Sequence, residues 1–370
     1  MPDAAHHARA IARAAQHLRR GGLVAFPTET VYGLGADALN PDAVARVFAA
    51  KGRPSNNPLI VHVDGEAMAQ TLVERWTSDA RKLAAAFWPG PLSIVLPRNA
   101  SVPDVVTGGG PNVAIRCPDH DLTRELIRAA DRPLVGPSAN KSGFVSPTAA
   151  EHVLREFPDA LLLPAAIHAE NSGDRTETPL DTILILDGGP CARGIESTVV
   201  RLPVSIGDHV VILRQGFVSA DQIAATLGRS VEIATPNTTI REQPHEALES
   251  PGLLDRHYAP RTPAFRFPPE QWPDVLDQII DLEAPDGLEA RAAVLTLGSR
   301  SVPSPHIRIA MPTDPRQYAA RLYAALREAD EQGLAAIYIE TPTQTPEPLW
   351  QAIADRVRRA TVTLPTPPNA

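Results

Sequence analysis

The sequence has few of the residues on which several common classes of protein depend. Its 370 residues include two cysteines, Cys117 and Cys191, which form no C-x-x-C pair and have no metal-ligand spacing. We therefore expect no disulfide framework and no cysteine metal site. No stretch approaches the roughly 18 consecutive apolar residues of a membrane helix. Acidic residues outnumber Lys and Arg by 43 to 35, and this net charge of -8 argues against broad nucleic-acid binding. These absences favour a cytoplasmic protein.

The residues that are present indicate an α/β protein with two domains. Hydrophobic residues make up 43% of the chain and charged residues 21%, which is ordinary for a globular protein. A length of 370 residues suggests two domains. Beyond residue 260, predicted strands alternate with predicted helices, which indicates a small parallel-sheet α/β domain. We place a first domain at residues 1–217, an interdomain linker at 218–260 and a second, small parallel-sheet domain at 261–370.

The first unit along the chain is a strand, a loop and a helix. The apolar residues 23–26 predict a buried strand, and Pro27 ends it. Residues 28–35 then predict a loop in which hydroxyl groups lie beside two glycines that allow a ligand to approach the backbone. Asn40 and Pro41 are typical of an N-cap followed by the first residue of a helix. This unit is a plausible ligand cleft.

Two cations at the end of that helix indicate a phosphate site. Lys51 and Arg53 are separated by one residue, and an ammonium and a planar guanidinium that converge on one point can hold several phosphate oxygens. The alternative is a solvated helix C-terminus, where cations suit the helix dipole. Residues 59–63 predict the next strand, which carries His62. A lone strand histidine is more often a core or surface residue than a ligand contact.

Later loops carry further small polar groups. Residues 137–143 follow a short strand, and Ser146-Pro147-Thr148 is predicted to cap the next helix, whose N–H groups would suit an anion. Ordinary capping explains the same residues equally well. The triple glycine at 108–110 is a weak nucleotide motif because no Lys-Ser or Lys-Thr follows it. Residues 158–181 predict an irregular surface insertion.

The linker ends in an unusual group, Arg256, His257 and Tyr258. One interpretation is that the tyrosine anchors the two domains to each other. The other is that the linker closes over the site as a lid, with Tyr258 or Arg256 touching the ligand. Beyond it, strands are predicted at 293–297 and 335–339, and helices at 315–331 and 348–360.

Eight motifs occur in a fixed order between residues 21 and 216: PTETVYGLG, KGRPSNNPLIVHV, VAIR, GPSANKSG, SPT, DGGP, GIESTVV and ILRQG. With the linker SPGLLDRHYAP and the α/β tail, they resemble the threonylcarbamoyl-AMP synthase family in its longer form. The resemblance implies a twisted mixed-sheet, YrdC-like domain with a deep cationic cavity. A linker and a small Rossmann-like parallel α/β domain would follow. Asn56, where Asp is common, and residues 345–350, where a Gly-Leu-Gly turn is usual, depart from the family pattern.

That family condenses L-threonine, bicarbonate or CO2 and ATP to threonylcarbamoyl-AMP and pyrophosphate. The product serves a downstream threonylcarbamoyl transferase complex that modifies position 37 of tRNA. Mg2+ would accompany ATP and be held mainly by phosphate oxygens. Such chemistry needs positioning and charge neutralisation rather than an enzymic nucleophile. Neither stable nucleic-acid binding nor a membrane partner is implied.

The resemblance also implies roles for individual residues, with Lys51 and Arg53 acting in catalysis. The residues implied for ATP are Lys51, Arg53, Ser55, Asn57, Asn112, Asn140, Ser146, Thr148, Arg214 and Tyr258. Those implied for threonine are Thr28, Tyr32, His62, Arg116, Ser138 and Ser197, with Arg116 as the natural partner of the carboxylate.

Two other functions are open to such a chain. One is an RNA-binding or scaffold module without synthase activity, against which the net charge and the lack of an aromatic-interleaved basic stripe count. The other is carbamoyl transfer within a larger maturation enzyme, which usually carries zinc-finger cysteines. Pyrophosphate release that depends on threonine and bicarbonate separates these functions.

Overall fold

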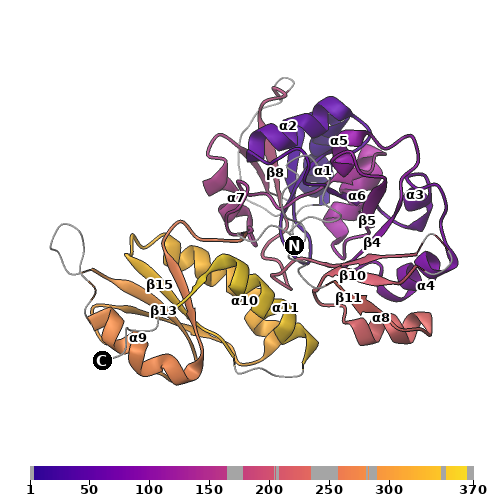
Figure 1. The fold of residues 1–370 in the computed structure, drawn as a ribbon. Helices are drawn as coiled ribbons and strands as arrows, with labels where there is room; N and C mark the ends of the chain where they lie inside the picture. Colours follow the sequence, from indigo (N-terminus) through magenta and orange to yellow (C-terminus); the bar gives the residue numbers. More distant parts are fainter. Residues whose placement is uncertain are drawn as a thin grey trace. The chain divides into compact units, whose positions relative to one another are not determined.

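A computed structural model gives the structure of the chain and describes residues 4–164, 178–203, 205, 208–234, 257–280, 282, 290–342 and 347–364. The chain divides into two compact units (Figure 1). The first comprises residues 1–142, 147–192 and 196–253. The second comprises residues 143–146, 193–195 and 254–370. Two short stretches that precede residue 217 therefore belong to the second unit.

An eleven-stranded mixed sheet forms the centre of the first unit, in the order β11-β10-β9-β4-β5-β3-β6-β2-β1-β8-β7. β1 pairs antiparallel with β2 and parallel with β8, and β5 pairs parallel with β3 and antiparallel with β4. The mixed α/β fold is therefore confirmed. The strands are β1 (Leu23–Phe26), β2 (Gly33–Asp37), β3 (Ile60–His62), β4 (Leu92–Pro97), β5 (Asn112–Arg116), β6 (Leu134–Val135), β7 (Leu161–Pro164), β8 (Ile183–Asp187), β9 (Thr198–Arg201), β10 (Val211–Arg214) and β11 (Glu232–Ile233).

Capping side chains mark the starts of α2, α4 and α8 in this unit. Asn40 caps α2 by accepting hydrogen bonds from the N–H groups of Asp42 and Ala43, and Gly52 ends it in the left-handed conformation with φ 60°. Thr77 caps α4 in the same manner. The bounds are α1 (Ala4–Arg19), α2 (Pro41–Lys51), α3 (Glu66–Gln70), α4 (Ser78–Phe87), α5 (Asp104–Thr107), α6 (Asp121–Ala130), α7 (Ala150–Glu156) and α8 (Ala220–Leu227).

Three local predictions are wrong. Residues 33–35 belong to β2 rather than to a loop. The glycines of this strand leave room for the Phe26 ring, since a Cβ on Gly35 would lie 2.7 Å from that ring. The predicted insertion at 158–181 begins with a strand, β7, paired to β8; residues 165–177 lie outside the described part. The Ser146-Pro147-Thr148 stretch does not cap α7, whose N-cap is Ala149 without a side-chain hydrogen bond.

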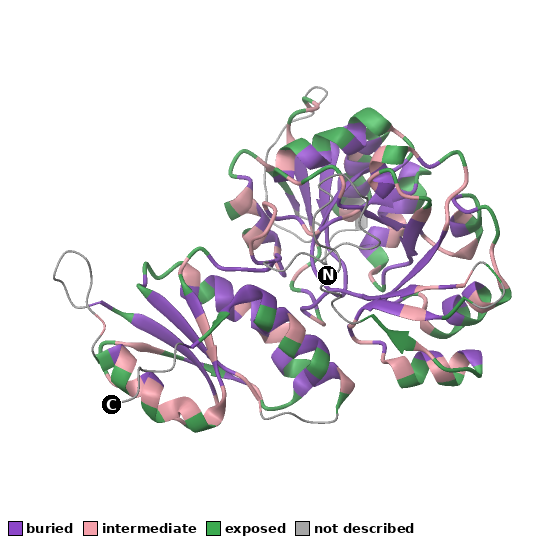
Figure 2. Ribbon diagram, viewed as in Figure 1, coloured by how far each residue is buried: buried purple, intermediate pink, exposed green. Residues whose placement is uncertain are grey.

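The central strands are buried along most of their length (Figure 2), and alternation of side chains gives the sheet two distinct faces. Val61, Val113 and Ile115 pack into the large core with α2 and α4. Their neighbours Ile60 and Ala114 belong to a separate small apolar cluster on the opposite face. His62 and Arg116 lie two residues beyond Ile60 and Ala114, so they share that second face. α1 and α6 bury a further cluster against β1 and β8.

The second unit is a five-stranded parallel sheet in the order β14-β13-β15-β12-β16, which confirms the predicted parallel α/β fold. α9 covers one face, where Val275 and Ile279 pack on Val294 and Tyr338. α10 and α11 lie on the other side of the sheet (Figure 1). The bounds are β12 (Ala264–Phe267), η1 (Pro269–Gln271), α9 (Trp272–Ile280), β13 (Ala292–Leu297), β14 (Ile307–Met311), α10 (Pro315–Asp330), β15 (Ala336–Glu340), α11 (Pro348–Ala360) and β16 (Val362–Thr363).

The described portion of the chain holds no helix that combines the length and the apolar character needed to cross a membrane.

Candidate active site

The ammonium group of Lys51 is enclosed by the loop that follows β6. Lys51 is the last residue of α2 and is buried. Its Nζ donates hydrogen bonds to the backbone carbonyl oxygens of Ser138 and Asn140, each at 2.5 Å. Burial, followed by the charge of Arg53, lowers the pKa of Lys51 well below its usual value. The structure thus brings the predicted K-x-R and S-x-N stretches together around a cation that an incoming anion would stabilise.

Arg53 is fixed by the turn that follows it. Its Nη2 donates to the Asn57 side-chain oxygen at 2.6 Å and to the Pro58 carbonyl at 2.9 Å. Asn57 is fully buried, and its Nδ2 has no hydrogen-bond partner within the described ranges. Ser55 is exposed in the same turn. The turn therefore presents a guanidinium, an amide and a hydroxyl close to one another.

His62 and Arg116 lie opposite each other on the paired strands β3 and β5. Burial, followed by the charge of Arg116, lowers the pKa of His62 to about 3. His62 is consequently neutral at physiological pH, and its ring contacts Phe26 edge to face with centroids 5.4 Å apart. This histidine does not act as a cation; it can only accept or donate a hydrogen bond.

Arg116 has a partner that sequence reasoning missed. Its Nη2 lies 2.7 Å from a carboxylate oxygen of Glu29, and both side chains are buried. Its Nη1 donates to the Thr30 hydroxyl at 3.0 Å and its Nε to the Gly90 carbonyl at 3.2 Å. The sequence offered one clue to this partner: Glu29 is the one charged residue of the hydroxyl-rich loop that contains Thr28.

The hydroxyl groups of the 28–32 loop are largely engaged in holding the loop. The Thr28 hydroxyl contacts the Thr30 hydroxyl and the Val31 carbonyl, and accepts from the N–H groups of both residues. The Tyr32 hydroxyl donates to the Gly189 carbonyl at 2.8 Å and accepts from the Gly188 N–H. Burial raises the pKa of Tyr32, so its hydroxyl stays protonated. Thr28 and Tyr32 therefore hold the 28–32 loop in place beside Arg116.

Arg214 and Ser197 meet at the far strands of the sheet. Arg214 donates through Nε to the Ser197 carbonyl at 3.1 Å and through Nη2 to the Ser197 hydroxyl at 3.2 Å. The same hydroxyl lies 2.9 Å from that of Ser93 on β4. All three side chains are buried, so the arginine is held in a fixed orientation.

Four other predicted residues make different contacts. Thr148 bonds His152 through its N–H at 3.2 Å. Ser146 and Tyr258 belong to the second unit, where the Ser146 carbonyl accepts from Arg327 and the Tyr258 ring stacks on Tyr323 with centroids 5.6 Å apart. Arg256 lies outside the described residues, as do residues 235–255 of the predicted lid.

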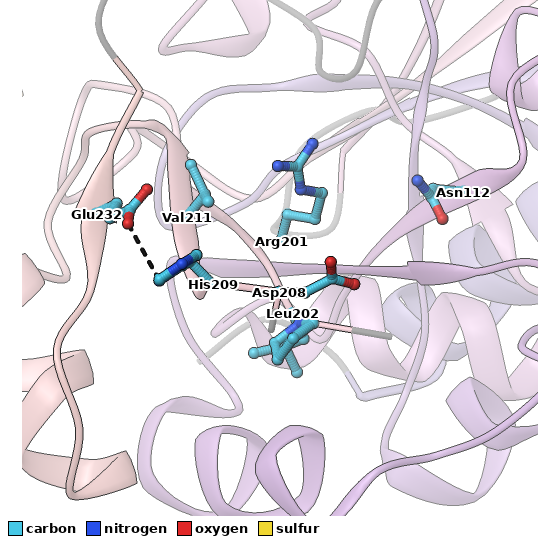
Figure 3. A pocket seen from close by; sticks show the side chains of 8 residues that line it. Asn112, Arg201, Leu202, Asp208, His209, Val211 and Glu232 are labelled. Atoms are coloured by element: carbon cyan, nitrogen blue, oxygen red, sulfur yellow. Dashed lines mark ion pairs between the residues drawn. The ribbon is translucent and has the colours of Figure 1, made fainter. Parts of the chain in front are cut away.

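The fourth, Asn112, begins the strand that ends at Arg116, roughly 13 Å along it. It lines a hollow of about 430 Å³ with Arg201, Asp208, His209 and Glu232 among its other residues (Figure 3). His209 and Glu232 form an exposed ion pair of 3.1 Å there. The deep cationic cavity implied by the resemblance stays a prediction.

The chemistry open to this site is the binding and orientation of anions. Burial raises the pKa of Cys117 to about 11 and that of Cys191 to about 12, so neither thiol is a ready nucleophile. Across the ranges described above, no three His, Cys, Asp or Glu side chains gather as metal ligands. Lys51 at the end of α2, Arg53 in the turn after it, Arg116 at the end of β5 and Arg214 at the end of β10 instead supply four basic side chains. That set suits a substrate carrying phosphates and a carboxylate.

Known proteins resemble this chain over most of its length. A family model described as "Telomere recombination" (Sua5_yciO_yrdC) matches residues 16–180. A second, "Threonylcarbamoyl-AMP synthase, C-terminal domain", matches residues 218–362. The threonylcarbamoyl-AMP synthase of Pyrococcus abyssi is 35% identical over 94% of this chain and 92% of its own length. That of Bacillus subtilis is 37% identical over 95% and 92%, respectively.

A solved structure agrees over both units. The crystal structure of P. abyssi Sua5 complexed with L-threonine has a TM-score of 0.78 to this chain, at 33% sequence identity, and 96% of each chain is covered. Fold, site and relatives together define an enzyme that transfers a nucleotidyl group. The chain belongs to the threonylcarbamoyl-AMP synthase family, in its two-domain form.

Proposed function

We propose that this chain condenses L-threonine, bicarbonate or CO2 and ATP to threonylcarbamoyl-AMP and pyrophosphate. The observation that carries the proposal is the likeness of nearly the whole chain to synthases of this one activity, at 33–37% identity. The hydrogen bonds from Lys51 to the Ser138 and Asn140 carbonyls also support the proposal. They join the two polar stretches that a phosphate substrate would require.

The reaction divides into two steps that need no enzymic nucleophile. The threonine amine and bicarbonate give a carbamate with loss of water. A carbamate oxygen then attacks the α-phosphorus, and the bond to the pyrophosphate oxygen breaks. The protein's task is to align the two reactants and to neutralise the charge on the leaving group. The thiols, whose pKa burial raises, and the neutral His62 are in keeping with a site that supplies no nucleophile.

The cations divide between the two substrates in this proposal. Lys51, Arg53 and Arg214 hold phosphates, with Ser55, Asn57, Asn112, Asn140 and Thr148 as further nucleotide contacts. Arg116 takes the threonine carboxylate, and Thr28, Tyr32, His62, Ser138 and Ser197 surround the amino acid. Because burial depresses the pKa of Lys51, a triphosphate that arrives beside it would favour the ammonium form and gain a strong ionic hydrogen bond.

Mg2+ is the metal that we propose to accompany ATP. The donor set of the described residues offers no carboxylate cage, so the ion would take its ligands chiefly from phosphate oxygens and water. When bound, it would reduce the negative charge of the triphosphate. The side chains of Lys51 and Arg53 would share that role.

The product defines the partner that we propose. A mixed carboxylic–phosphoric anhydride is labile in water, so a downstream threonylcarbamoyl transferase complex must consume it to modify position 37 of tRNA. The cytosol is the compartment we propose, because the two buried cysteines carry free thiols, as a reducing environment allows.

Pyrophosphate release tests the proposal. The purified chain with ATP and Mg2+ should release pyrophosphate only when L-threonine and bicarbonate are both present, and a threonylcarbamoyl-adenylate should form in equal amount. An RNA-binding or scaffold module would release none. Release that does not depend on threonine would contradict the proposed substrate.

A further inference from the structure

The carboxylate of Glu29 is buried without the hydrogen bonds that a buried carboxylate ordinarily has. The side chain is 5% exposed, and its Oε2 lies 2.7 Å from Nη2 of Arg116. Neither Glu29 oxygen has a hydrogen-bond donor among the residues that the structure describes. An ionised carboxylate can accept about four hydrogen bonds, and leaving a buried polar group without them is costly.

Several neighbouring donors are committed to other acceptors. The N–H groups of Thr30 and Val31, which follow Glu29 directly, both donate to the Thr28 hydroxyl. Arg116 donates through Nε to the Gly90 carbonyl and through Nη1 to the Thr30 hydroxyl. Only the Nη2 end of the guanidinium therefore faces Glu29. The pair is an ion pair, without the bidentate geometry of a structural Arg–carboxylate bridge.

A buried carboxylate beside a buried guanidinium matches the charge pattern of an α-amino acid. The amino acid offers a carboxylate to Arg116 and, on the adjacent carbon, an ammonium group with three donors. Resting on the proposed function, we propose that Glu29 binds the α-amino group of L-threonine while Arg116 binds its carboxylate. Glu29 then supplies an acceptor for the nitrogen that becomes the carbamate.

This assignment explains the arrangement better than a structural ion pair. A structural pair gains little from burial unless its remaining lone pairs are satisfied. The ammonium group of a ligand would satisfy those of Glu29, and the low exposure of both residues would strengthen the contact by excluding water. The amino acid would thus be recognised at two adjacent atoms by two residues from different elements, the 28–32 loop and β5.

The test compares two ligands on two proteins by calorimetry or ligand-observed NMR. L-Threonine carries the amino group, and (R)-3-hydroxybutanoate is the same molecule with hydrogen in its place. Glu29→Gln should lower the affinity for L-threonine roughly 10- to 100-fold, because a charged hydrogen bond is lost. Its affinity for (R)-3-hydroxybutanoate should not fall, because that ligand has no amino group and Glu29→Gln removes a negative charge beside Arg116.

Glu66→Gln is the matched control. Glu66 also pairs with an arginine, Arg81, at 3.1 Å, but on α3 and partly exposed. This variant should leave the affinities for both ligands unchanged. An equal loss of both ligands in Glu29→Gln would overturn the inference, since Glu29 would then act only through Arg116. Unchanged threonine affinity would overturn it as well.

The wild-type protein decides the question if Glu29→Gln does not fold. The wild type should bind L-threonine at least about tenfold more tightly than (R)-3-hydroxybutanoate, since only threonine reaches the carboxylate. Equal affinities would overturn the inference. The proposed function fails separately: a wild type that shows this ligand preference, yet releases no pyrophosphate from ATP with threonine and bicarbonate, would bind the amino acid as assigned without being the synthase.

Discussion

Lys51 and Asn140 are 89 positions apart in the sequence, yet the Lys51 ammonium nitrogen lies 2.5 Å from the Asn140 carbonyl oxygen. The end of α2 and the loop after β6 are thereby joined at one atom. Neither stretch is a phosphate site by itself, because each is an ordinary helix end or polar turn when taken alone. Their contact makes the lysine a buried, oriented cation, and the proposed nucleotide site depends on it.

Replacing this lysine should remove turnover and reduce stability together. Lys51→Met keeps the aliphatic stem but leaves the carbonyls of Ser138 and Asn140 without their donor. We expect turnover to fall by about 100-fold or more, since an ionic contact with the leaving group is lost. The free energy of unfolding should fall by about 1–3 kcal/mol. Pyrophosphate release and urea denaturation measure the two effects.

Lys141→Met is the control for that change. Lys141 is also a lysine of this region, but its Nζ bonds the Ala50 carbonyl at 2.7 Å and lies over the Phe157 ring. Its replacement should leave most of the turnover. Wild-type turnover in Lys51→Met would contradict the phosphate role of Lys51.

Acid should unfold the protein partly through His62. The pKa of His62 is about 3 in the fold and 6.5 when unfolded, so between these values the unfolded chain binds the extra proton. Stability is therefore lost as pH falls from 6.5 towards 3, by at most about 5 kcal/mol for this group. His62→Gln should make the free energy of unfolding less steep with pH over this window. The exposed His6→Gln should not, and an unchanged slope in His62→Gln would refute the assignment.

A single methyl group on β2 should destabilise the first unit. In Gly35→Ala the new Cβ would lie 2.7 Å from the Phe26 ring and 2.9 Å from the Val24 carbonyl oxygen. Because the backbone carbonyl cannot move aside easily, we expect a loss of about 1–3 kcal/mol by chemical denaturation. Gly65→Ala meets no atom within 4 Å and should be tolerated. Equal stability of the two variants would show that β2 does not need its glycine.

Amino-acid selectivity should depend on the threonine hydroxyl more than on its methyl group. A buried site that hydrogen-bonds a hydroxyl rejects the analogue lacking it by orders of magnitude, whereas one methyl group is worth only ~1–3 kcal/mol. Serine should be a poor substrate and 2-aminobutyrate a poorer one. Equal kcat/KM for 2-aminobutyrate and threonine would contradict this order.

Local sequence signals were sufficient where the governing interactions are local. Asn40 and Thr77 mark helix starts because their own side chains accept hydrogen bonds from backbone N–H groups two or three residues further along the chain. The apolar run that forms β1 is recognisable because the strand is buried along its whole length. Motif order was enough to predict the family, since many short stretches in one sequence rarely coincide by chance.

The same local reasoning failed where a distant group decides the outcome. Residues 33–35 form a strand because the Phe26 ring packs on their glycines, and no propensity of glycine indicates that. Ser146 and Thr148 look like helix caps, yet α7 begins at Ala150 without a side-chain cap.

By itself the sequence determined the α/β class of both halves, the helix that ends at Lys51, and the family. Only the tertiary structure decided that Lys51 is enclosed by two carbonyls and that Arg116 faces Glu29. Alternation along β3 and β5 gives His62 and Arg116 a common face, but their pairing in register makes them neighbours. The physical reason is that burial and opposite charge act through space: a lysine with a depressed pKa and an unsatisfied carboxylate exist only once the chain has folded around them.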